Sequence, residues 1–325
     1  MSAIDKQTAA AQSLSTPSRG RDHTRRRGSG ARRRSTFVTA LPYLVPTALL
    51  YGYFLIYPML DSVRLSFFKW SGFRTEVPTW VGLDNYVRLF TGADTVFWKA
   101  FQNSLIWACL AVVVPMTLSL LLALALNRKM VGRNLFRSVF YIPAVFASIT
   151  VAAMWRWIYN PTLGAVNQLL SALGLGSWTH QWLGDPKVAL YSIFVAAVWQ
   201  GVGFNMVLFL AGLQQVPPEL VEAAKLDGAR GFQIFRHVTM PALRPTFVVV
   251  LILTIISSLK VFDLVVGMTG GGPAQSTQVL ALWSYTQSFA NHNFGQGGAV
   301  ATVLLVISLC LVVPYLSWAL KGEED

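Results

Sequence analysis

Six polar or charged side chains lie within long apolar segments of this sequence, where their types and spacing could act on a polar solute. They are Gln200, Asn205, Ser257, Ser258, Lys260 and Asp263. Lys260 and Asp263 are spaced i, i+3, so on a continuous helix they can share one face and neutralise each other. A charge in the middle of a membrane costs about 3 kcal/mol on insertion scales, so each of these two needs a reason to be there.

Two interpretations of these six residues remain open. The polar groups, with Ser148 and Thr150 at a similar depth, could line a water-filled path and hydrogen-bond the hydroxyls of a solute. They could equally hold helices together, as an internal Lys260–Asp263 ion pair and as interhelical hydrogen bonds worth about 1 kcal/mol each. Arg156 is expected near a segment end, with its charged head reaching the membrane surface.

Motifs for covalent, metal or nucleotide chemistry are missing from the sequence. There is no G-x-x-x-x-G-K-[ST] phosphate loop and no G-x-S-x-G nucleophile elbow. The glycine-rich stretch Thr269–Pro273 has no following Lys, and we interpret it as a turn. The four histidines are scattered, so no metal site is expected, and Cys109 and Cys310 are interpreted as packing residues within apolar runs. The sequence therefore contains no motif that would support an enzymatic function.

The composition is that of an integral membrane protein. Of 325 residues, 54% are hydrophobic and only 12% are charged, which is too little charge to cover a soluble globule of this size. A membrane-spanning helix needs about 20 mostly apolar residues. Six segments meet this requirement, and we predict six transmembrane helices within a domain of residues 37–320: 41–60, 101–126, 137–158, 189–213, 246–268 and 298–320.

The basic residues are concentrated on one side of these spans. A tail of residues 1–36 is rich in Arg, Ser and Gly and is predicted to be disordered. With the loops after spans two and four and residue Lys321, this side carries 18 of the 26 Lys and Arg residues. The positive-inside rule therefore places both termini, including the short tail 321–325, in the cytoplasm. Contact of the Arg-rich tail with anionic lipid or nucleic acid is the alternative, and no nucleic-acid partner is expected.

The longest polar interruption on the cytoplasmic side, residues 214–245, predicts two short helices around a break. Pro217 and Pro218 suit the first turn of a helix, and acidic residues follow near its positive end. Val221, Ala224 and Gly228 recur at i, i+3 and i+7 and predict a narrow face of small side chains. A small face would let another protein's backbone come close.

Gly228 can supply the turn that ends the first of these helices, because glycine tolerates a positive φ. Phe232, Phe235 and Val238 give the second segment an apolar stripe, and Pro241 with Pro245 is expected to stop it. From these residues alone, a docking element and a membrane-surface hairpin that only tethers two spans are equally acceptable.

A family resemblance favours the docking element. Glu222-Ala223-Ala224, Asp227-Gly228-Ala229 and Met240-Pro241 resemble the EAA loop of permease subunits in binding-protein-dependent ABC importers, with Met240 where Leu is usual. The resemblance covers nearly the whole chain after Ala40. Its further segments are similar to the carbohydrate branch, which includes the maltose and glycerol-3-phosphate importer permeases: Trp80–Tyr86, Asn205, Phe262-Asp263 and Thr269–Pro273.

The resemblance implies an all-α membrane protein with the six-helix type I importer permease fold. It also implies that the loop forms a coupling helix, seated in a groove of a separate ATPase, in which Glu222 pairs with a basic group, Ala223 and Ala224 permit close packing, and Gly228 allows the turn. The coupling residues are then Glu222, Ala223, Ala224, Leu226, Asp227, Gly228, Ala229 and Pro241.

The implied activity is inward transport of a sugar or sugar-like solute by alternating access in the cytoplasmic membrane. The implied partners are a homologous second permease subunit that completes a heterodimer, an ATPase dimer, an extracytoplasmic solute-binding protein and membrane lipid. ATP would be bound by the ATPase, and no cofactor is expected in this chain. Two rivals have less support: a secondary carrier would need more buried acids and inverted repeats, and a membrane enzyme or scaffold would need a reactive cluster or a soluble domain.

Overall fold

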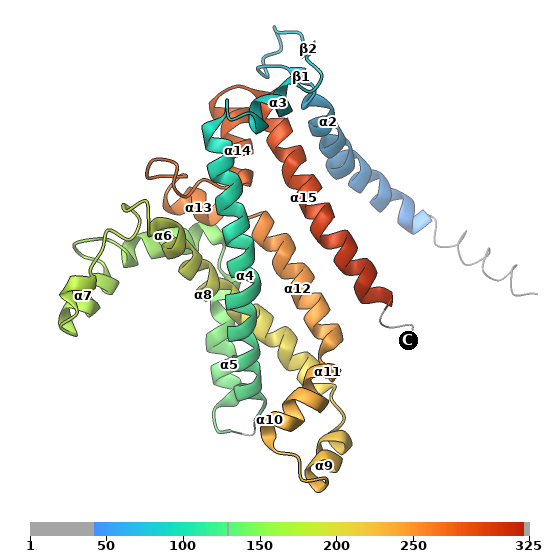
Figure 1. The fold of residues 1–325 in the computed structure, drawn as a ribbon, viewed down its shortest axis with the longest axis vertical. Coiled ribbons are helices and arrows are strands. Elements are labelled where there is room, and N and C mark those ends of the chain that lie inside the picture. The colour runs from blue at the N-terminus through green and yellow to red at the C-terminus, as the bar shows by residue number, and fades with distance from the viewer. Residues whose placement is uncertain (1–41, 129, 322–325) are drawn as a thin grey trace, which may run out of the picture. The chain divides into compact units, whose positions relative to one another are not determined.

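The structure is a computed structural model that describes residues 42–128 and 130–321 (Figure 1). The predicted basic tail 1–36, Lys129 and residues 322–325 lie outside the described residues. The chain divides into two compact units, residues 1–57 and 58–325, and each is described by itself. In the first unit the described residues are helical and include the π-helix η1 (Gly52–Ile56). They belong to a 24-residue apolar helix, Pro42–Leu65, so the described part of the predicted span 41–60 is helical, and the helix ends later than expected.

The second unit is built around the long helix α4 (Thr95–Asn127), which contains the predicted span 101–126. Asp94 begins α4 because its carboxylate accepts hydrogen bonds from the N–H groups of Val96 and Phe97, which have no partner inside the helix. Before α4 come the end of α2 (Tyr57–Leu65), a two-stranded antiparallel ladder of β1 (Phe68–Lys69) and β2 (Thr79–Trp80), and α3 (Asp84–Phe90).

The predicted span 137–158 is bent in the structure. It consists of α5 (Arg133–Tyr141), the 3-10 helix η2 (Ile142–Val145) and α6 (Ser148–Ile158), with a bend of 101° between η2 and α6. Pro143 lies in η2, and Phe146 and Ala147 have extended backbone angles, so the chain changes direction there. After α6, the segment before the next span contains α7 (Ala165–Ala172) and η3 (Gly176–Trp178).

The fourth span is confirmed as one helix, α8 (Ala189–Gln214), whereas the fifth is broken. Residues 246–268 form α12 (Arg244–Leu259) and α13 (Asp263–Met268), with a break at residues 260–262. The Ser258 hydroxyl donates to the carbonyl of Ile255 (2.8 Å), a local bond that competes with the regular helix pattern one residue before α12 ends. Between α8 and α12 lie α9 (Pro218–Leu226), α10 (Gly231–Ile234), the π-helix η4 (Phe235–Thr239) and α11 (Met240–Ala242).

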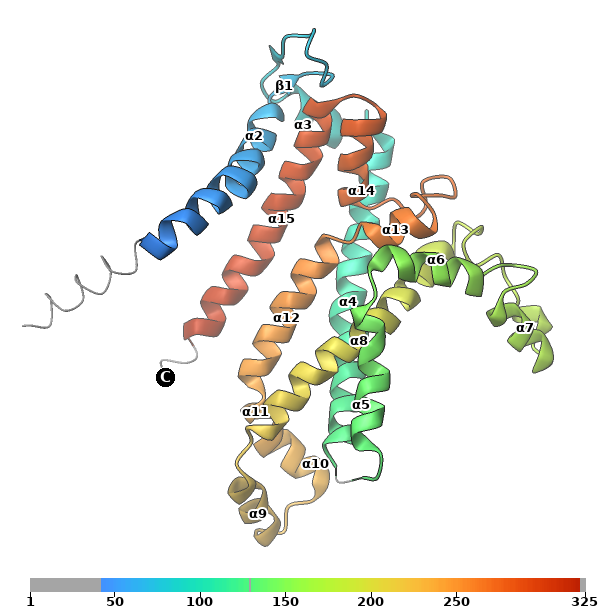
Figure 2. The same ribbon diagram turned by 180° about the vertical axis from the view of Figure 1, so that it is seen from behind.

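The chain ends with α14 (Leu280–Tyr285), the π-helix η5 (Thr286–Ala290) and α15 (Phe294–Lys321), which contains the predicted span 298–320. Figures 1 and 2 show α9, α10 and α11 at one end of the second unit, which we call the α9 end. At the opposite end lie β1, β2, α3, α14 and η5, which we call the α3 end.

Apolar side chains and close backbone contacts hold the helices of the second unit together. One cluster joins α4, α6, α8 and α13, a second joins α4, α8 and α12, and a third joins α3, α4, α14 and α15. On α8, Gly203 lies against the carbonyl of Phe140, and Gly212 lies against Thr246, so neither position has room for a Cβ. Small residues of this kind let membrane helices approach closely.

Four helices in the described part of the chain are long and apolar enough to cross a membrane: Pro42–Leu65, α4, α8 and Phe294–Trp318. The number rises to six if two bent pairs each count as one span. These pairs are Arg133–Val145 with Ser148–Ile158, and Gly231–Ala242 with Arg244–Leu259.

Candidate functional site

All six predicted path residues, Gln200, Asn205, Ser257, Ser258, Lys260 and Asp263, line one cavity of about 310 Å³. The cavity lies between α4, α8, α12 and α13, and its wall includes the break between α12 and α13. Trp107, Phe194, Phe204 and Phe262 add aromatic surface to it. Aromatic faces together with a few convergent polar groups are typical of sites for small polar ligands. Ser148 also lines the cavity, whereas Thr150 does not.

Lys260 and Asp263 do not share a helical face, which corrects the prediction from their spacing. Lys260 directly follows the last residue of α12, and Asp263 is the first residue of α13. Within the described ranges the single ion pair is that of Arg64 with Asp61, so no salt bridge joins the two charges. Both side chains are exposed, and each charge faces the cavity region without neutralising the other.

Two of the six polar residues form hydrogen bonds within the protein. The amide of Gln200 donates to the carbonyl of Phe146 (2.9 Å) and to the hydroxyl of Ser148 (3.3 Å), which ties α8 to the start of α6. Ser258 is buried and bonds its own helix. Asn205 and Ser257 have no side-chain hydrogen bond to any described residue. The amide of Asn205 and the hydroxyl of Ser257 are therefore available to a solute.

The sequence analysis missed Thr254 as a member of this cavity. Thr254 is buried, lines the same cavity, and its hydroxyl oxygen has no hydrogen-bond partner in the described structure. A buried polar atom without a partner is costly and marks a place where a bound molecule or water can compensate. The signal was present in the sequence, because Thr254 precedes Ser258 by four residues and so shares its helical face.

The loop 214–245 forms two helical segments around a break, as predicted. Helix α9 ends at Leu226, and Gly228 has φ +80°, a left-handed conformation that favours glycine. The N–H of Ala229 then donates to the carbonyl of Ala224 (2.9 Å), which closes the turn. Ala229 is half-buried, and Asp227 is exposed at the end of α9.

The exposed face of α9 differs from the one predicted. Val221 and Ala224 are half-buried, and Gly228 lies beyond the end of the helix, so these three residues form no outward face of small side chains. Glu222 and Ala223 are exposed instead, and Leu226 is 89% exposed. On the following helix Phe232 is 72% exposed. Large apolar side chains beside acidic ones therefore cover the outside of this loop.

The second segment of the loop ends between its two prolines, before the next span begins, as predicted. The chain is helical through α10, η4 and α11 as far as Ala242, with Pro241 in the first turn of α11 and Pro245 in the first turn of α12. Proline is tolerated in a first turn because its missing N–H has no partner there in any case. The bend of 68° falls between the two prolines.

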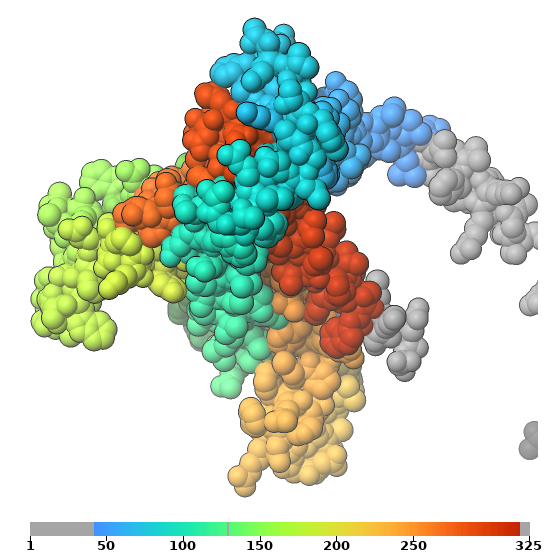
Figure 3. Space-filling view, turned by 45° about the horizontal axis from the view of Figure 1, so that its top comes forward, coloured from blue at the N-terminus to red at the C-terminus, as the bar shows by residue number. Residues whose placement is uncertain are grey.

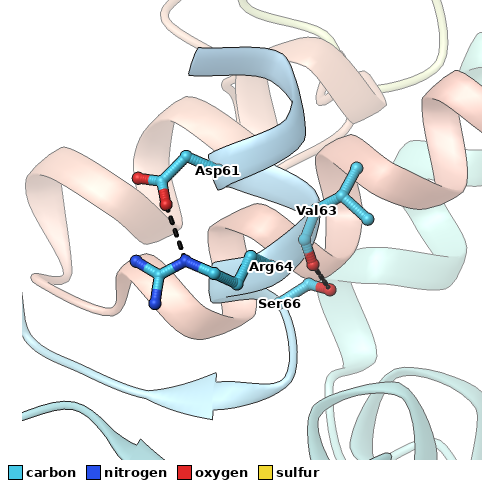
Figure 4. Close-up of polar contacts among 4 residues, drawn as sticks. All are labelled: Asp61, Val63, Arg64 and Ser66. Carbon is cyan, nitrogen blue, oxygen red and sulfur yellow. Dashed lines mark hydrogen bonds and ion pairs between the residues drawn. The ribbon is translucent and has the colours of Figure 1, made fainter. Parts of the chain in front are cut away.

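Other segments that carry the family resemblance serve to hold the α3 end together. Asn85 is buried, and its amide donates to the carbonyls of Ser66 (2.8 Å) and Phe68 (3.0 Å). The hydroxyl of Tyr86 shares a hydrogen bond with that of Ser66 (2.6 Å). Figure 4 shows Ser66 beside the Arg64–Asp61 pair, with its hydroxyl donating to the carbonyl of Val63 (2.6 Å).

The stretch Thr269–Pro273 is a turn, as predicted, and the segment after it is anchored by α4. Gly270 and Gly271 both have positive φ, and the hydroxyl of Thr269 bonds that of Thr277 (2.7 Å). The amide of Asn103 donates to the carbonyls of Ser276 and Gln278, at 2.8 Å each. This stretch has a structural role that its residues alone did not indicate.

Asp94 is a second important residue that the sequence did not single out. Its other carboxylate oxygen accepts from the indole of Trp283 (2.9 Å) and from the amides of Gln287 (3.3 Å) and Gln296 (3.4 Å). Together with the capping bonds, five donors surround one buried carboxylate. The Asp before a helical run is a recognisable capping signal, but the three side-chain donors are far away in the sequence.

Comparison with known proteins agrees with this geometry. Residues 115–320 match the model of a family described as the inner membrane component of binding-protein-dependent transport systems. A probable ABC transporter permease protein of Pyrococcus horikoshii is 36% identical over 290 residues, covering 87% of this chain and 98% of the relative. A multiple sugar-binding transport system permease protein of Streptococcus mutans is 35% identical over 265 residues, covering 82% of this chain and 89% of the relative.

A solved structure shows the same fold. A chain in the crystal structure of a bacterial ABC transporter involved in the import of the acidic polysaccharide alginate aligns with a TM-score of 0.75 and 24% identity, over 89% of this chain and 96% of that chain. The chain therefore has a type I ABC importer permease fold. The chain belongs to the family of inner membrane components of binding-protein-dependent transport systems, and it is a multi-pass permease subunit.

Proposed function

We propose that this subunit moves a sugar or sugar-like solute inward through the cavity between α4, α8, α12 and α13. The observation that carries the proposal is the convergence of Asn205, Thr254, Ser257, Lys260 and Asp263 on one cavity, without bonds among these side chains. Hydroxyl, amide and charged groups together offer both donors and acceptors, as a polyhydroxylated solute requires. The Streptococcus mutans relative is a permease of a multiple sugar-binding transport system, which supports this solute class.

The α9 end is proposed to couple transport to a separate ATPase. The exposed Leu226 and Phe232 give apolar surface, and Glu222 offers a carboxylate without a partner in the described chain. An exposed apolar patch with adjacent charges is typical of a protein docking site. Glu222, Ala223, Ala224, Leu226, Asp227, Gly228, Ala229 and Pro241 remain the proposed coupling residues, with Ala224 and Ala229 shaping the turn rather than its outer surface.

The assembly and topology are proposed on the same basis. The permease pairs with a homologous second permease, two ATPase copies bind the ATP, and a solute-binding protein delivers the solute from outside. Six spans are proposed from the lengths of the apolar segments, and cytoplasmic termini from the distribution of Lys and Arg along the sequence. A structural relative solved in complex with a periplasmic protein supports the last of these partners.

Gly228→Val tests the coupling role, with Gly231→Val as the matched control. An added Cβ meets no atom within 4 Å at either position, but only Gly228 has a positive φ. A β-branched residue at positive φ costs about 1–2 kcal/mol, so the turn after α9 should be disturbed only in the first variant. We expect Gly228→Val to abolish ATP-driven uptake in proteoliposomes while the complex still assembles, and Gly231→Val to transport. Normal uptake by an assembled Gly228→Val complex would refute the coupling role.

Asn205→Ala tests the solute path in the same reconstituted complex. Loss of one hydrogen bond to the solute is worth about 1 kcal/mol, so the KM for uptake of the transported sugar should rise about fivefold. Thr150→Ala is the control, because Thr150 is exposed and does not line the cavity. An unchanged KM for Asn205→Ala, with uptake intact, would exclude Asn205 from the path and leave the permease function standing.

A further inference from the structure

The segment from Trp157 to Gly184, between α6 and α8, contains no Asp, Glu, Lys or Arg in 28 residues. It includes α7 and η3, and we call it the α7 lobe. Connections between elements of a soluble protein are usually polar and solvated. A long uncharged connection therefore calls for an explanation other than exposure to water.

The polar groups inside the α7 lobe bond to each other. The amide of Asn167, a buried residue, donates to the carbonyls of Pro161 and His180, at 3.0 Å each, and its oxygen accepts from the indole of Trp182 (2.7 Å). The side-chain oxygen of Asn160 accepts from the N–H groups of Thr162 (3.0 Å) and Leu163 (2.9 Å). Internal satisfaction of polar groups is what apolar surroundings demand.

The outer surface of the lobe carries large apolar side chains among uncharged polar ones such as Gln168 and Ser171. Trp157, Leu163, Leu169, Leu173 and Trp178 are each between 62% and 74% exposed. Leu169 and Leu173 are four residues apart at the end of α7 and so lie on one face. An exposed patch of this kind on a water-facing loop would favour aggregation.

The lobe lies beside the helices of the second unit and not at either end. Figures 1 and 2 show α6 and α7 extending sideways, level with α8 and the middle of α4, on the side away from α15. Figure 3 shows the same lobe standing out from the flank of the unit. The lobe joins the end of α6 to the start of α8, a helix apolar enough to cross a membrane, so it is placed where α8 leaves the bilayer.

We propose that the α7 lobe is a lipid-binding element that lies in the interface of the bilayer. Leu163, Leu169 and Leu173 contact acyl chains, and Trp157 and Trp178 lie at the level of the headgroups, where amphipathic rings are enriched. The proposal goes beyond the transport function, and the orientation proposed above assigns the lobe to the outer leaflet. Lipid is favoured over a protein partner because the lobe offers no charge, whereas the α9 surface combines Leu226 with Glu222.

Spin-label accessibility in the reconstituted complex tests this proposal. Cys109→Ser and Cys310→Ser first remove the two free cysteines. A nitroxide is then attached at Leu169→Cys or Leu173→Cys, and at Thr75→Cys as an exposed control in the loop between β1 and β2. The labelled complex is reconstituted in liposomes of phosphatidylethanolamine and phosphatidylglycerol. Collisions of the nitroxide are then measured with oxygen, which partitions into lipid, and with nickel ethylenediaminediacetate, which stays in water.

We expect collisions at positions 169 and 173 to be dominated by oxygen, and those at position 75 by the nickel complex. Nickel accessibility at 169 and 173 equal to that at 75 would mean that the lobe is in water and would overturn the proposal. Protection from both reagents would mean that a protein covers the lobe and would overturn it as well. The assay measures no transport, so its outcome is independent of the proposed transport function.

Discussion

The α3 end and the α9 end of the second unit differ in how they use their polar side chains. At the α3 end, Asp94, Asn85 and Asn103 are buried and each bonds at least two groups from other segments. At the α9 end the hydrogen bonds of side chains are local, such as that from the N–H of Arg230 to the amide oxygen of Gln233 (2.7 Å). No charged side chain of α9 forms an ion pair with a described residue.

The polar side chains of the α3 end find their hydrogen-bond partners within the chain. The side chains exposed at the α9 end remain available to a partner protein. A buried carboxylate with five donors stabilises one arrangement of the chain, because leaving any of those donors unpaired is costly. Exposed Leu226 and Phe232 contribute little to the folded chain itself. The comparison predicts that matched substitutions at the two ends have opposite consequences for stability and coupling.

The largest expected effect comes from Asp94→Ala. This change removes the N-cap of α4 and leaves Trp283, Gln287 and Gln296 without an acceptor. We expect the free energy of unfolding to fall by about 4 kcal/mol, seen as a large drop in Tm of the purified protein in detergent. Asp227→Ala is the control at the other end, since Asp227 is exposed at the end of α9. An equal drop in Tm for the two variants would contradict the proposed difference between the α3 end and the α9 end.

A smaller contrast is expected between Leu89→Ala and Leu226→Ala. Leu89 is fully buried among α3, α4, α14 and α15, so its truncation should leave a cavity and cost about 3 kcal/mol. Leu226 is 89% exposed, so its truncation should leave Tm nearly unchanged while ATP-driven uptake falls. If Leu226→Ala lowered Tm as much as Leu89→Ala, then α9 would be part of the folded core and not a docking surface.

The smallest expected effect is a local pH dependence in the loop before β2. The hydroxyl of Ser71, together with its N–H, donates to the carboxylate of Glu76 and lowers the pKa of Glu76 below its ordinary 4.5. A lowered folded-state pKa means that the bond stabilises the loop above pH 4.5 and that this contribution is lost as the pH falls further.

Hydrogen exchange of a peptide covering residues 68–80 measures this contribution. At pH 7 the wild type should exchange more slowly than Glu76→Gln, and the difference should disappear as the pH falls below 4.5 and the carboxylate becomes protonated. A difference that persists at the lower pH would show that the charge of Glu76 does not order the loop.

The helical architecture and the loop around Gly228 could be predicted from sequence because both depend on local signals. Apolar runs of sufficient length predict helices, and Gly228 has the positive φ that its place after α9 indicated. The six polar residues that stand out within the apolar runs also line one cavity, whereas their role in a solute path stays a prediction.

The sequence failed where a local pattern had to be combined with distant contacts. The i, i+3 spacing of Lys260 and Asp263 indicates a shared face only if the helix continues, and the break at residues 260–262 removes that condition. The outward face of α9 was misjudged because burial of Val221 and Ala224 depends on η4, which follows later in the chain. The donors around Asp94 come from α14, η5 and α15, which no spacing rule connects to α4.

The break between α12 and α13 also affects how tightly the membrane is sealed. Each helix end leaves backbone N–H and carbonyl groups without partners inside the helix, and such groups in a cavity of about 310 Å³ attract water. The apolar layer that separates the water on the two sides of the membrane is therefore thinner at this point than the bilayer itself. Resistance to ion and proton leakage then depends on the short apolar stretches above and below the break, where a single polar substitution would matter more than elsewhere in the span.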